Sequence, residues 1–265
     1  VSNLVGKQSH ELNEAVTSEK KIGAGDQGIM FGYATAESAS RLPFGFDLAN
    51  KIIAAIENDI ETNPNCPFKG DAKTQVTVDL DAEPTFASVQ TVVVSVCHKY
   101  MANIDDVRTA VTALIQNLFG ENPLPELIIN PSGSWTLGGP TADCGLTGRK
   151  IVCDQYGGYC AVGGGAFSGK DPTKVDRSAS YMARHLACKL LDIYKLSWCE
   201  VQLGYAIGIA EPVSLVIKND KNIPLEEYVL ENYDLPPLGI IEKLNLIDRD
   251  YERLAEGCHY REALI

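Results

Sequence analysis

Hydrophobic residues recur at intervals of three and four along three long segments, and each of these segments is predicted to form an amphipathic helix. The first covers residues 43–61, where apolar side chains run from Phe46 to Ile60. The second covers residues 105–118 and the third residues 172–196. All three patterns place the apolar side chains on one side, so each helix is expected to cover a core.

Strands are predicted where apolar and polar residues alternate or where β-branched residues cluster. TQVTVDL (74–80) and TVVVSV (91–96) are expected to pair with each other. Further short strands are expected within residues 23–34, and at 127–130, 134–137, 150–153, 200–209 and 213–217. Residues 1–22 are polar without a clear period and predict a loop, whereas three short helices are expected within residues 224–256.

This order of elements predicts an α+β fold, in which antiparallel sheets are covered by helices on one face. A strand-strand-helix unit recurs at residues 74–118 and 200–232. Residues 138–170 are rich in glycine and nearly without periodicity. Because a long irregular segment inside a compact domain is usually either functional or disordered, and this one carries motifs, we expect it to be functional.

Composition and charge exclude several kinds of partner. The formal net charge of -12 makes nucleic acids and anionic membranes poor partners, because both would be repelled. No apolar run reaches the roughly 18 residues that span a bilayer, and the opening residues lack the pattern of a signal peptide.

The eight cysteines form no CxxC pair, and the four histidines complete no zinc-finger spacing. Reduced thiols and a cytoplasmic location are therefore expected.

The segment GGGAFSGKDPTKVD (163–176) carries the clearest sign of chemistry. Lys170, Lys174 and Arg177 gather at the expected helix start, where cations face the positive end of the helix dipole. Cations that tolerate this repulsion usually bind an anion, and a glycine-rich backbone before a helix is suited to binding phosphate. The alternative is an ordinary helix start, with Asp171-Pro172 as N-cap and first helical residue.

Other charged residues extend this pattern. Three more cations stand beside glycine or short polar residues, namely Lys73, Arg149 and Lys150. A triphosphate carries about four negative charges and needs several donors, although each lysine taken alone would suit a solvated surface. The accompanying carboxylates are Asp26, Asp71, Asp143 and Asp176. Carboxylates beside phosphates bind Mg²⁺, or they accept hydrogen bonds from a ribose or an amine; a turn or a first helical turn explains Asp26 and Asp176 equally well.

Two common catalytic patterns are disfavoured. Residues 164–170 almost match the Walker A motif, but Asp171 stands where a Ser or Thr would contact Mg²⁺. No GxSxG motif is present, and His98 and His185 have no apparent catalytic partners. His185 is expected to be partly exposed on its helix.

Five motifs together resemble S-adenosylmethionine synthetase, also called methionine adenosyltransferase. They are GAGDQGIMFGYA (23–34), DAKTQV (71–76), GGPTADCGLTGRKIVCDQYGG (138–158), GGGAFSGKDPTKVDRSASYMAR (163–184) and YAIGIAEP (205–212). The resemblance runs from about residue 6 to about residue 260 in matching order. It implies three similar α+β units about a pseudo-threefold axis, with two subunits packed sheet to sheet. It also implies a reaction of ATP with L-methionine that requires Mg²⁺ and K⁺.

The resemblance also implies roles for individual residues. Those implied in catalysis are Lys73, Arg149, Lys170 and Lys174. Those implied to bind ATP and its polyphosphate are Asp71, Lys73, Trp135, Asp143, Arg149, Lys150 and Lys170, with Trp135 in the place of a Phe that stacks on adenine. Asp26, Lys174 and Ile207 would contact methionine, and Asp176 would hold Mg²⁺.

The sequence also departs from the family pattern. The opening His-Pro-Asp-Lys motif and the carboxylate-bearing stretch that follows it are absent, Ala161-Val162 replace a basic pair, and CHYREALI ends the chain without His-Phe-Gly-Arg. GKQSHEL (6–12) matches the end of the family's gating loop. We therefore expect a gating-loop end and connecting strand at 1–36 and α+β units at 37–138 and 139–265, with the remaining unit largely absent.

Three functions remain open at this level. In the first, the chain is a synthetase that acts as a homodimer or tetramer, or together with a partner chain that supplies the missing N-terminal segment. Alternatively, it is a truncated non-catalytic homologue that binds nucleotide or regulates a full-length synthetase. A third alternative is a phosphohydrolase that keeps only the triphosphate-cleaving half of the reaction.

Overall fold

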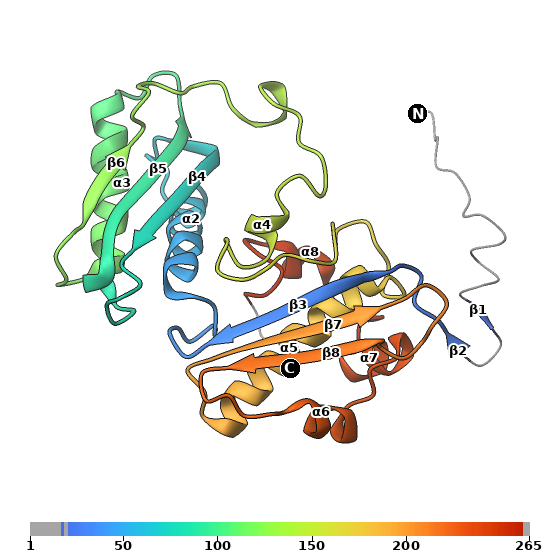
Figure 1. The fold of residues 1–265 in the computed structure, drawn as a ribbon. Coiled ribbons are helices and arrows are strands. Elements are labelled where there is room, and N and C mark those ends of the chain that lie inside the picture. Colours follow the sequence, from blue (N-terminus) through green and yellow to red (C-terminus); the bar gives the residue numbers. More distant parts are fainter. Residues whose placement is uncertain (1–16, 19–20, 262–265) are drawn as a thin grey trace, which may run out of the picture. The chain divides into compact units, whose positions relative to one another are not determined.

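A computed structural model describes residues 17–18 and 21–261, which fall into two compact units (Figure 1). The contiguous unit comprises residues 37–146. The composite unit joins the described parts of residues 1–36 and 147–265. The division of the chain expected from the sequence, at residues 36 and 138, stays a prediction.

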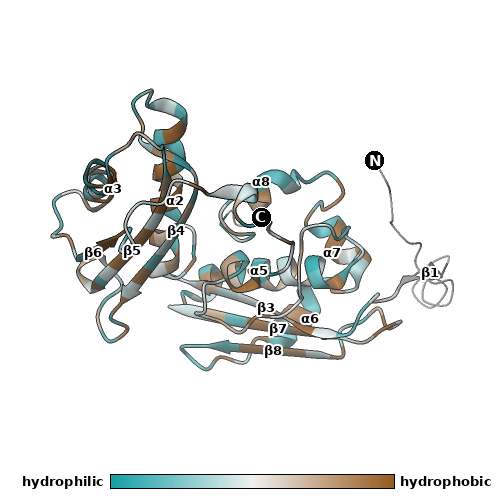
Figure 2. Ribbon diagram, turned by 90° about the horizontal axis from the view of Figure 1, so that it is seen from above, coloured by the Kyte–Doolittle hydropathy of each residue, from teal (hydrophilic) through white to brown (hydrophobic). Residues whose placement is uncertain are grey.

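The contiguous unit packs two helices on a three-stranded sheet. Its elements are α2 (Phe44–Thr62), β4 (Phe68–Val78), the 3-10 turn η1 (Phe86–Ser88), β5 (Val89–His98), α3 (Ile104–Phe119), β6 (Glu126–Ile129) and the 3-10 turn η2 (Gly139–Thr141). The core side chains include Ile52, Ile56, Val92, Val94, Val96, Val107, Val111 and Ile115. Hydrophobic stretches along α2, β5 and β6 are visible in Figure 2.

The sheet of this unit has the order β4-β5-β6, and its two pairings differ in direction. β4 and β5 are antiparallel, as expected, whereas β5 and β6 are parallel. The expectation of purely antiparallel sheets is wrong here, because α3 lies between β5 and β6. A helical crossover returns the chain to the end of the sheet where β5 began, and the next strand then runs in the same direction.

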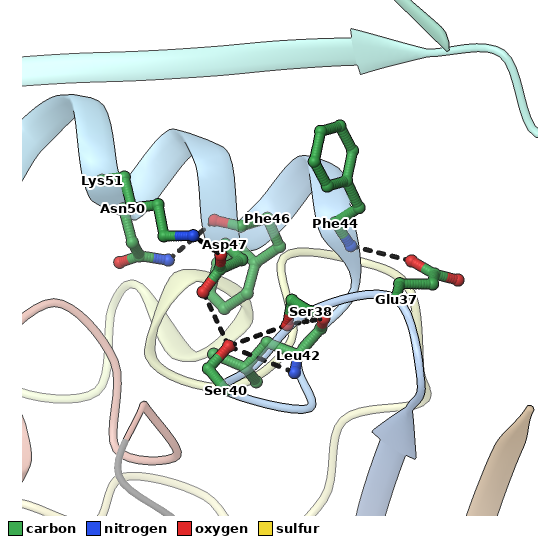
Figure 3. Close-up of polar contacts among 9 residues, drawn as sticks. All are labelled: Glu37, Ser38, Ser40, Leu42, Phe44, Phe46, Asp47, Asn50 and Lys51. Atoms are coloured by element: carbon green, nitrogen blue, oxygen red, sulfur yellow. Dashed lines mark hydrogen bonds and ion pairs between the residues drawn. The ribbon is translucent and has the colours of Figure 1, made fainter. Parts of the chain in front are cut away.

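The start of α2 is stabilised by side chains rather than by its N-cap residue, Pro43, which makes no side-chain cap. The Glu37 carboxylate accepts a hydrogen bond from the Phe44 amide at 2.8 Å (Figure 3). Asp47 is buried in the first turn, accepts a hydrogen bond from Ser40 at 2.6 Å and pairs with Lys51 at 2.6 Å. Negative charge at this helix end interacts favourably with the helix dipole.

The composite unit also packs helices on a three-stranded sheet. Its elements are β1 (Thr17–Ser18), β2 (Lys21–Ile22), β3 (Gly28–Thr35), α4 (Ile151–Asp154), α5 (Val175–Tyr194), β7 (Trp198–Tyr205), β8 (Ser214–Asn219), α6 (Glu226–Asn232), α7 (Pro237–Lys243) and α8 (Tyr251–Ala255). The sheet has the order β3-β7-β8 and is antiparallel throughout.

α5 lies against this sheet (Figure 1), and glycine permits the close approach. A Cβ at Gly32 of β3 would overlap the backbone of Ala183 on α5. Most of α5 is buried, including His185, which is only 4% exposed. The expectation of a partly exposed His185 is therefore wrong, because α5 is covered on more than one side.

Several local predictions also differ from the structure. The helix expected from residue 172 begins at Val175, so Asp171-Pro172 is not its start. Residues 150–153 contain a short helix instead of a strand, and residues 134–137 form no strand. The loop predicted at 1–22 lies mostly outside the described residues, but Thr17–Ser18 and Lys21–Ile22 pair as short strands.

The remaining helices and strands are confirmed, with their ends shifted by a few residues. None of the helices in the described part of the chain is long and apolar enough to cross a membrane.

Candidate functional site

The glycine run Gly163–Gly165 is held between a strand and a helix of the composite unit. A Cβ at Gly163 would overlap the carbonyl oxygen of Ile29 on β3, and one at Gly164 would overlap the backbone oxygen of Asp176 on α5. Gly164 and Gly165 have φ angles of 84° and 52°. Side chains would be excluded here by contact and by conformation, so the run requires glycine.

Lys170 and Asp176 meet at the end of this run. The Lys170 Nζ donates to Asp176 Oδ2 at 2.5 Å, and their side chains are 33% and 14% exposed. A Cβ on Gly165 would lie 3.3 Å from the Lys170 Nζ. The candidate polyphosphate ligand and the candidate Mg²⁺ ligand are therefore neighbours, and both adjoin the glycine backbone.

Lys174 occupies the N-cap position of α5 and makes no side-chain cap. Asp171 accepts hydrogen bonds from the amide and the hydroxyl of Thr173, at 2.9 and 2.5 Å. Burial raises the pKa of Asp171, but these hydrogen bonds outweigh it and the pKa lies below its usual value. The Lys174 Nζ lies 3.7 Å from Asp171 Oδ2 and remains 37% exposed. Lys170 and Lys174, in the turn before α5, are thus both partly exposed to solvent.

Arg149 and Lys150 adjoin the same region. Gly148, with a φ of 80°, approaches so closely that its Cβ would lie 2.6 Å from that of Ala166. This contact brings the exposed Arg149-Lys150 pair beside the segment that carries Lys170. The structure therefore groups four of the five predicted polyphosphate cations within one unit, around glycine backbone.

Asp26 and Ile207 are brought together by backbone hydrogen bonds between their loops. The Ala24 amide donates to the Ile209 carbonyl at 3.0 Å, and the Gly208 amide donates to the Ala24 carbonyl at 2.8 Å. Asp26 is exposed and accepts a hydrogen bond from the Gln27 amide, as a turn residue would. Ile207 is 45% exposed. The two candidate methionine contacts therefore stand on adjoining loops.

The remaining predicted residues lie in the contiguous unit. Asp71 lies within the register shift of β4 between Phe68 and Ala72, and it accepts a hydrogen bond from the Gly139 amide at 2.7 Å. Asp143 is exposed, and its amide donates to the Gly139 carbonyl. Asp71 and Asp143 are thus joined through one glycine turn, whereas Lys73 points to solvent from β4.

Trp135 is fixed by a histidine that sequence reasoning left without a role. The Trp135 amide donates to His98 Nε2 at 3.1 Å, and the Trp135 carbonyl accepts from the His98 amide at 2.8 Å. The indole Nε1 donates to the Leu137 carbonyl. No spacing rule signals this contact, because 37 positions separate the two residues.

Among the described residues, no three His, Cys, Asp or Glu side chains converge to form a metal site. Mg²⁺ is usually bound through one or two carboxylates, with substrate phosphates and water completing its shell. Asp176 fits this mode, because its carboxylate is partly exposed, at 14%, and lies beside Lys170, a candidate phosphate cation.

Comparisons with known proteins identify the family to which the chain is similar. Residues 21–135 match the family model described as S-adenosylmethionine synthetase, central domain, and residues 137–264 match the C-terminal domain of the same family. Among solved structures, the chain is similar to an unusual S-adenosylmethionine synthetase from Campylobacter jejuni. The identity is 34% and the TM-score 0.81, over 91% of this chain and 69% of the other. The α+β fold and these matches show that the chain belongs to the S-adenosylmethionine synthetase family.

Proposed function

We propose that this chain synthesises S-adenosylmethionine from ATP and L-methionine. The observation that carries the proposal is the Lys170–Asp176 pair beside the glycine run, with Lys174 and Arg149-Lys150 close by. A cluster of cations with one carboxylate suits a polyphosphate better than a single phosphate, since several charges must be neutralised.

In the reaction, the methionine sulfur attacks C5′ of the ribose, and the C5′–oxygen bond breaks. The triphosphate leaves with the bonding electron pair and is then hydrolysed to pyrophosphate and phosphate. Negative charge grows on the leaving oxygen, so preorganised cations stabilise the transition state more than the ground state. We assign this role to Lys73, Arg149, Lys170 and Lys174, and we assign Lys150 to polyphosphate binding. No side chain needs to act as a nucleophile.

The substrate contacts follow the same assignment. Trp135 would stack on the adenine, and Asp71 and Asp143 would accept hydrogen bonds from polar groups of the substrates. Asp26 would bind the methionine ammonium, while Lys174 and Ile207 would complete the methionine pocket. The hydrogen bond between Asp71 and Gly139 keeps that carboxylate in place before any substrate arrives.

Two cations are proposed with the substrates. Asp176 would hold Mg²⁺ together with phosphate oxygens, where the ion supplies positive charge to the leaving group. K⁺ is proposed on the family resemblance alone, and no residue of this chain is assigned to it. Homo-oligomers, or a complex with a partner chain that carries the family's N-terminal segment, are the proposed assemblies. The cytoplasm is the proposed compartment, in keeping with eight free cysteines.

The test is formation of S-adenosylmethionine by this chain from ATP, methionine, Mg²⁺ and K⁺. Lys174→Ala is expected to lower kcat by about 10²-fold or more, because it removes a cation from the leaving group. Lys99→Ala is the matched control, since Lys99 is an exposed lysine of the contiguous unit, and it should leave the rate unchanged.

Unchanged turnover in Lys174→Ala would contradict the assignment. Nucleotide binding without product would favour the non-catalytic homologue. Triphosphate hydrolysis without product would favour the phosphohydrolase.

A further inference from the structure

Arg177 is a buried cation whose charge is not neutralised within the described structure. It is 5% exposed, and none of the described carboxylates forms an ion pair with it. Its Nε also lacks a hydrogen-bond partner among the described residues. Burying a cation without a carboxylate is costly, so a function that needs the charge there would explain why it is tolerated.

The contacts of Arg177 point to Lys170. Arg177 Nη1 donates to the Lys170 carbonyl at 2.7 Å. The guanidinium lies over the ring of Tyr251 on α8, with 4.2 Å from its central carbon to the ring centroid, and 5.9 Å from the ring of Tyr181. Arg177 therefore joins the backbone that carries the Lys170 side chain to the ring of Tyr251, 74 positions after Arg177 in the chain.

We propose that Arg177 is a positioning residue for Lys170, and that Tyr251 holds Arg177 in that position. The inference rests on the proposed polyphosphate site and assigns Arg177 no contact with substrate, since its side chain is enclosed. A charge-assisted hydrogen bond to the Lys170 carbonyl fixes the backbone from which Nζ reaches Asp176. The cation–π contact restricts the guanidinium to one orientation. The charge also adds to the positive potential near Lys170, because burial of the guanidinium lowers the effective dielectric around it.

The closing experiment measures the binding of inorganic tripolyphosphate with Mg²⁺ by calorimetry, which requires no turnover. Arg177→Gln is expected to weaken the affinity by about tenfold, in line with the loss of a hydrogen bond from a charged group. Lys221→Gln is the matched control. Lys221 is a cation whose Nζ donates to the carbonyls of Tyr194 and Lys195 at the other end of α5. The Lys221→Gln variant removes the same charge and a similar backbone contact. Its affinity for tripolyphosphate should stay within about twofold of that of the unaltered chain, because surface charges are screened over the distance between the two ends of α5.

A second pair of variants tests the role of Tyr251. Tyr251→Phe keeps the ring but loses the hydroxyl, which donates to the Leu246 carbonyl at 2.6 Å. Tyr251→Leu loses the ring. The affinity should persist in the first variant and fall in the second, and Arg177→Gln with Tyr251→Leu should weaken binding less than the product of the two single effects.

The outcomes separate the two proposals. Equal affinity in Arg177→Gln and the unaltered chain would overturn the positioning role alone. Equal losses in Arg177→Gln and Lys221→Gln would overturn it too, because the effect would then follow charge or stability in general. No tripolyphosphate binding by the unaltered chain would overturn the polyphosphate site, and the role of Arg177 with it.

Discussion

At the scale of single residues, His259 shows how burial sets a protonation state. The imidazole is 3% exposed, and its Nδ1 lies 2.8 Å from the Tyr181 hydroxyl. Burial and, to a smaller extent, the positive charge of Arg177 together lower the pKa of His259 to about 4. Phe167, from the segment after the glycine run, packs edge-on against this ring. A charge on His259 would thus arise against Phe167, which lies between the glycine run and Lys170 in the sequence.

This burial predicts a pH dependence of stability. The imidazole is neutral in both states above about pH 6.5, so its contribution is then constant. As the pH falls from 6.5 toward 4, the unfolded chain takes up the proton and the folded chain does not, which lowers the free energy of unfolding by up to about 3 kcal/mol. His259→Asn, which keeps a polar atom near Tyr181, should lack this component. Urea denaturation at pH 7.5 and pH 4.5 measures it, and parallel losses in the two proteins would refute the prediction.

What a sequence can predict about a residue depends on whether its neighbours are local. Glycine, lysine and aspartate at 163–176 indicate a phosphate site, because the chemistry lies within one short segment. The N-cap expected at Asp171 is wrong, since its carboxylate bonds with Thr173 in a turn before the helix. The contacts of Arg177 with Tyr251 and of His98 with Trp135 join distant positions. No local sequence pattern predicts these two contacts.

At the scale of elements, Gly163 is required by the space around it, whereas Gly164 and Gly165 are also required by their positive φ angles. Gly163 packs against the carbonyl of Ile29 on β3. Gly163→Ala should lower the free energy of unfolding by about 2 kcal/mol, as overpacking does, and should weaken tripolyphosphate binding because the run is displaced from α5. Gly145→Ala is the matched control, since its Cβ would enter open space. Its unfolding free energy should change by less than about 0.5 kcal/mol. Chemical denaturation and calorimetry on both variants check this, and equal effects would exclude the steric explanation.

The sequence predicts long elements better than short ones for a physical reason. α2 and α3 present several turns of apolar side chains to a core, so their periodicity is clear and both were found within about two residues of the expected ends. Residues 150–153 contain β-branched Ile151 and Val152, which favour a strand, but no strand of the described structure pairs with them, and the segment forms one helical turn. The parallel pairing of β6 with β5 could not be predicted either, because hydrophobic periodicity carries no information about strand direction.

At the scale of the whole molecule, the sheet of the composite unit has one covered and one less covered face. α5 lies on one side, while alternate residues on the other face remain accessible, including Ile29 at 50% and Val216 at 39%. The formal net charge of -12 would oppose random association. Exposed apolar side chains among the polar residues of this face suit a specific partner, and on the family resemblance we propose that the partner is the same sheet of a second copy.

A charge placed on this sheet face tests the proposed dimer. Val216→Glu should shift the chain from dimer to monomer in sedimentation velocity at micromolar concentration, because a carboxylate buried without a partner costs several kcal/mol. Leu230→Glu is the matched control, since Leu230 is 60% exposed on α6, outside the sheet, and it should sediment as the unaltered chain does. A dimer that persists in Val216→Glu would place the contact elsewhere on the chain.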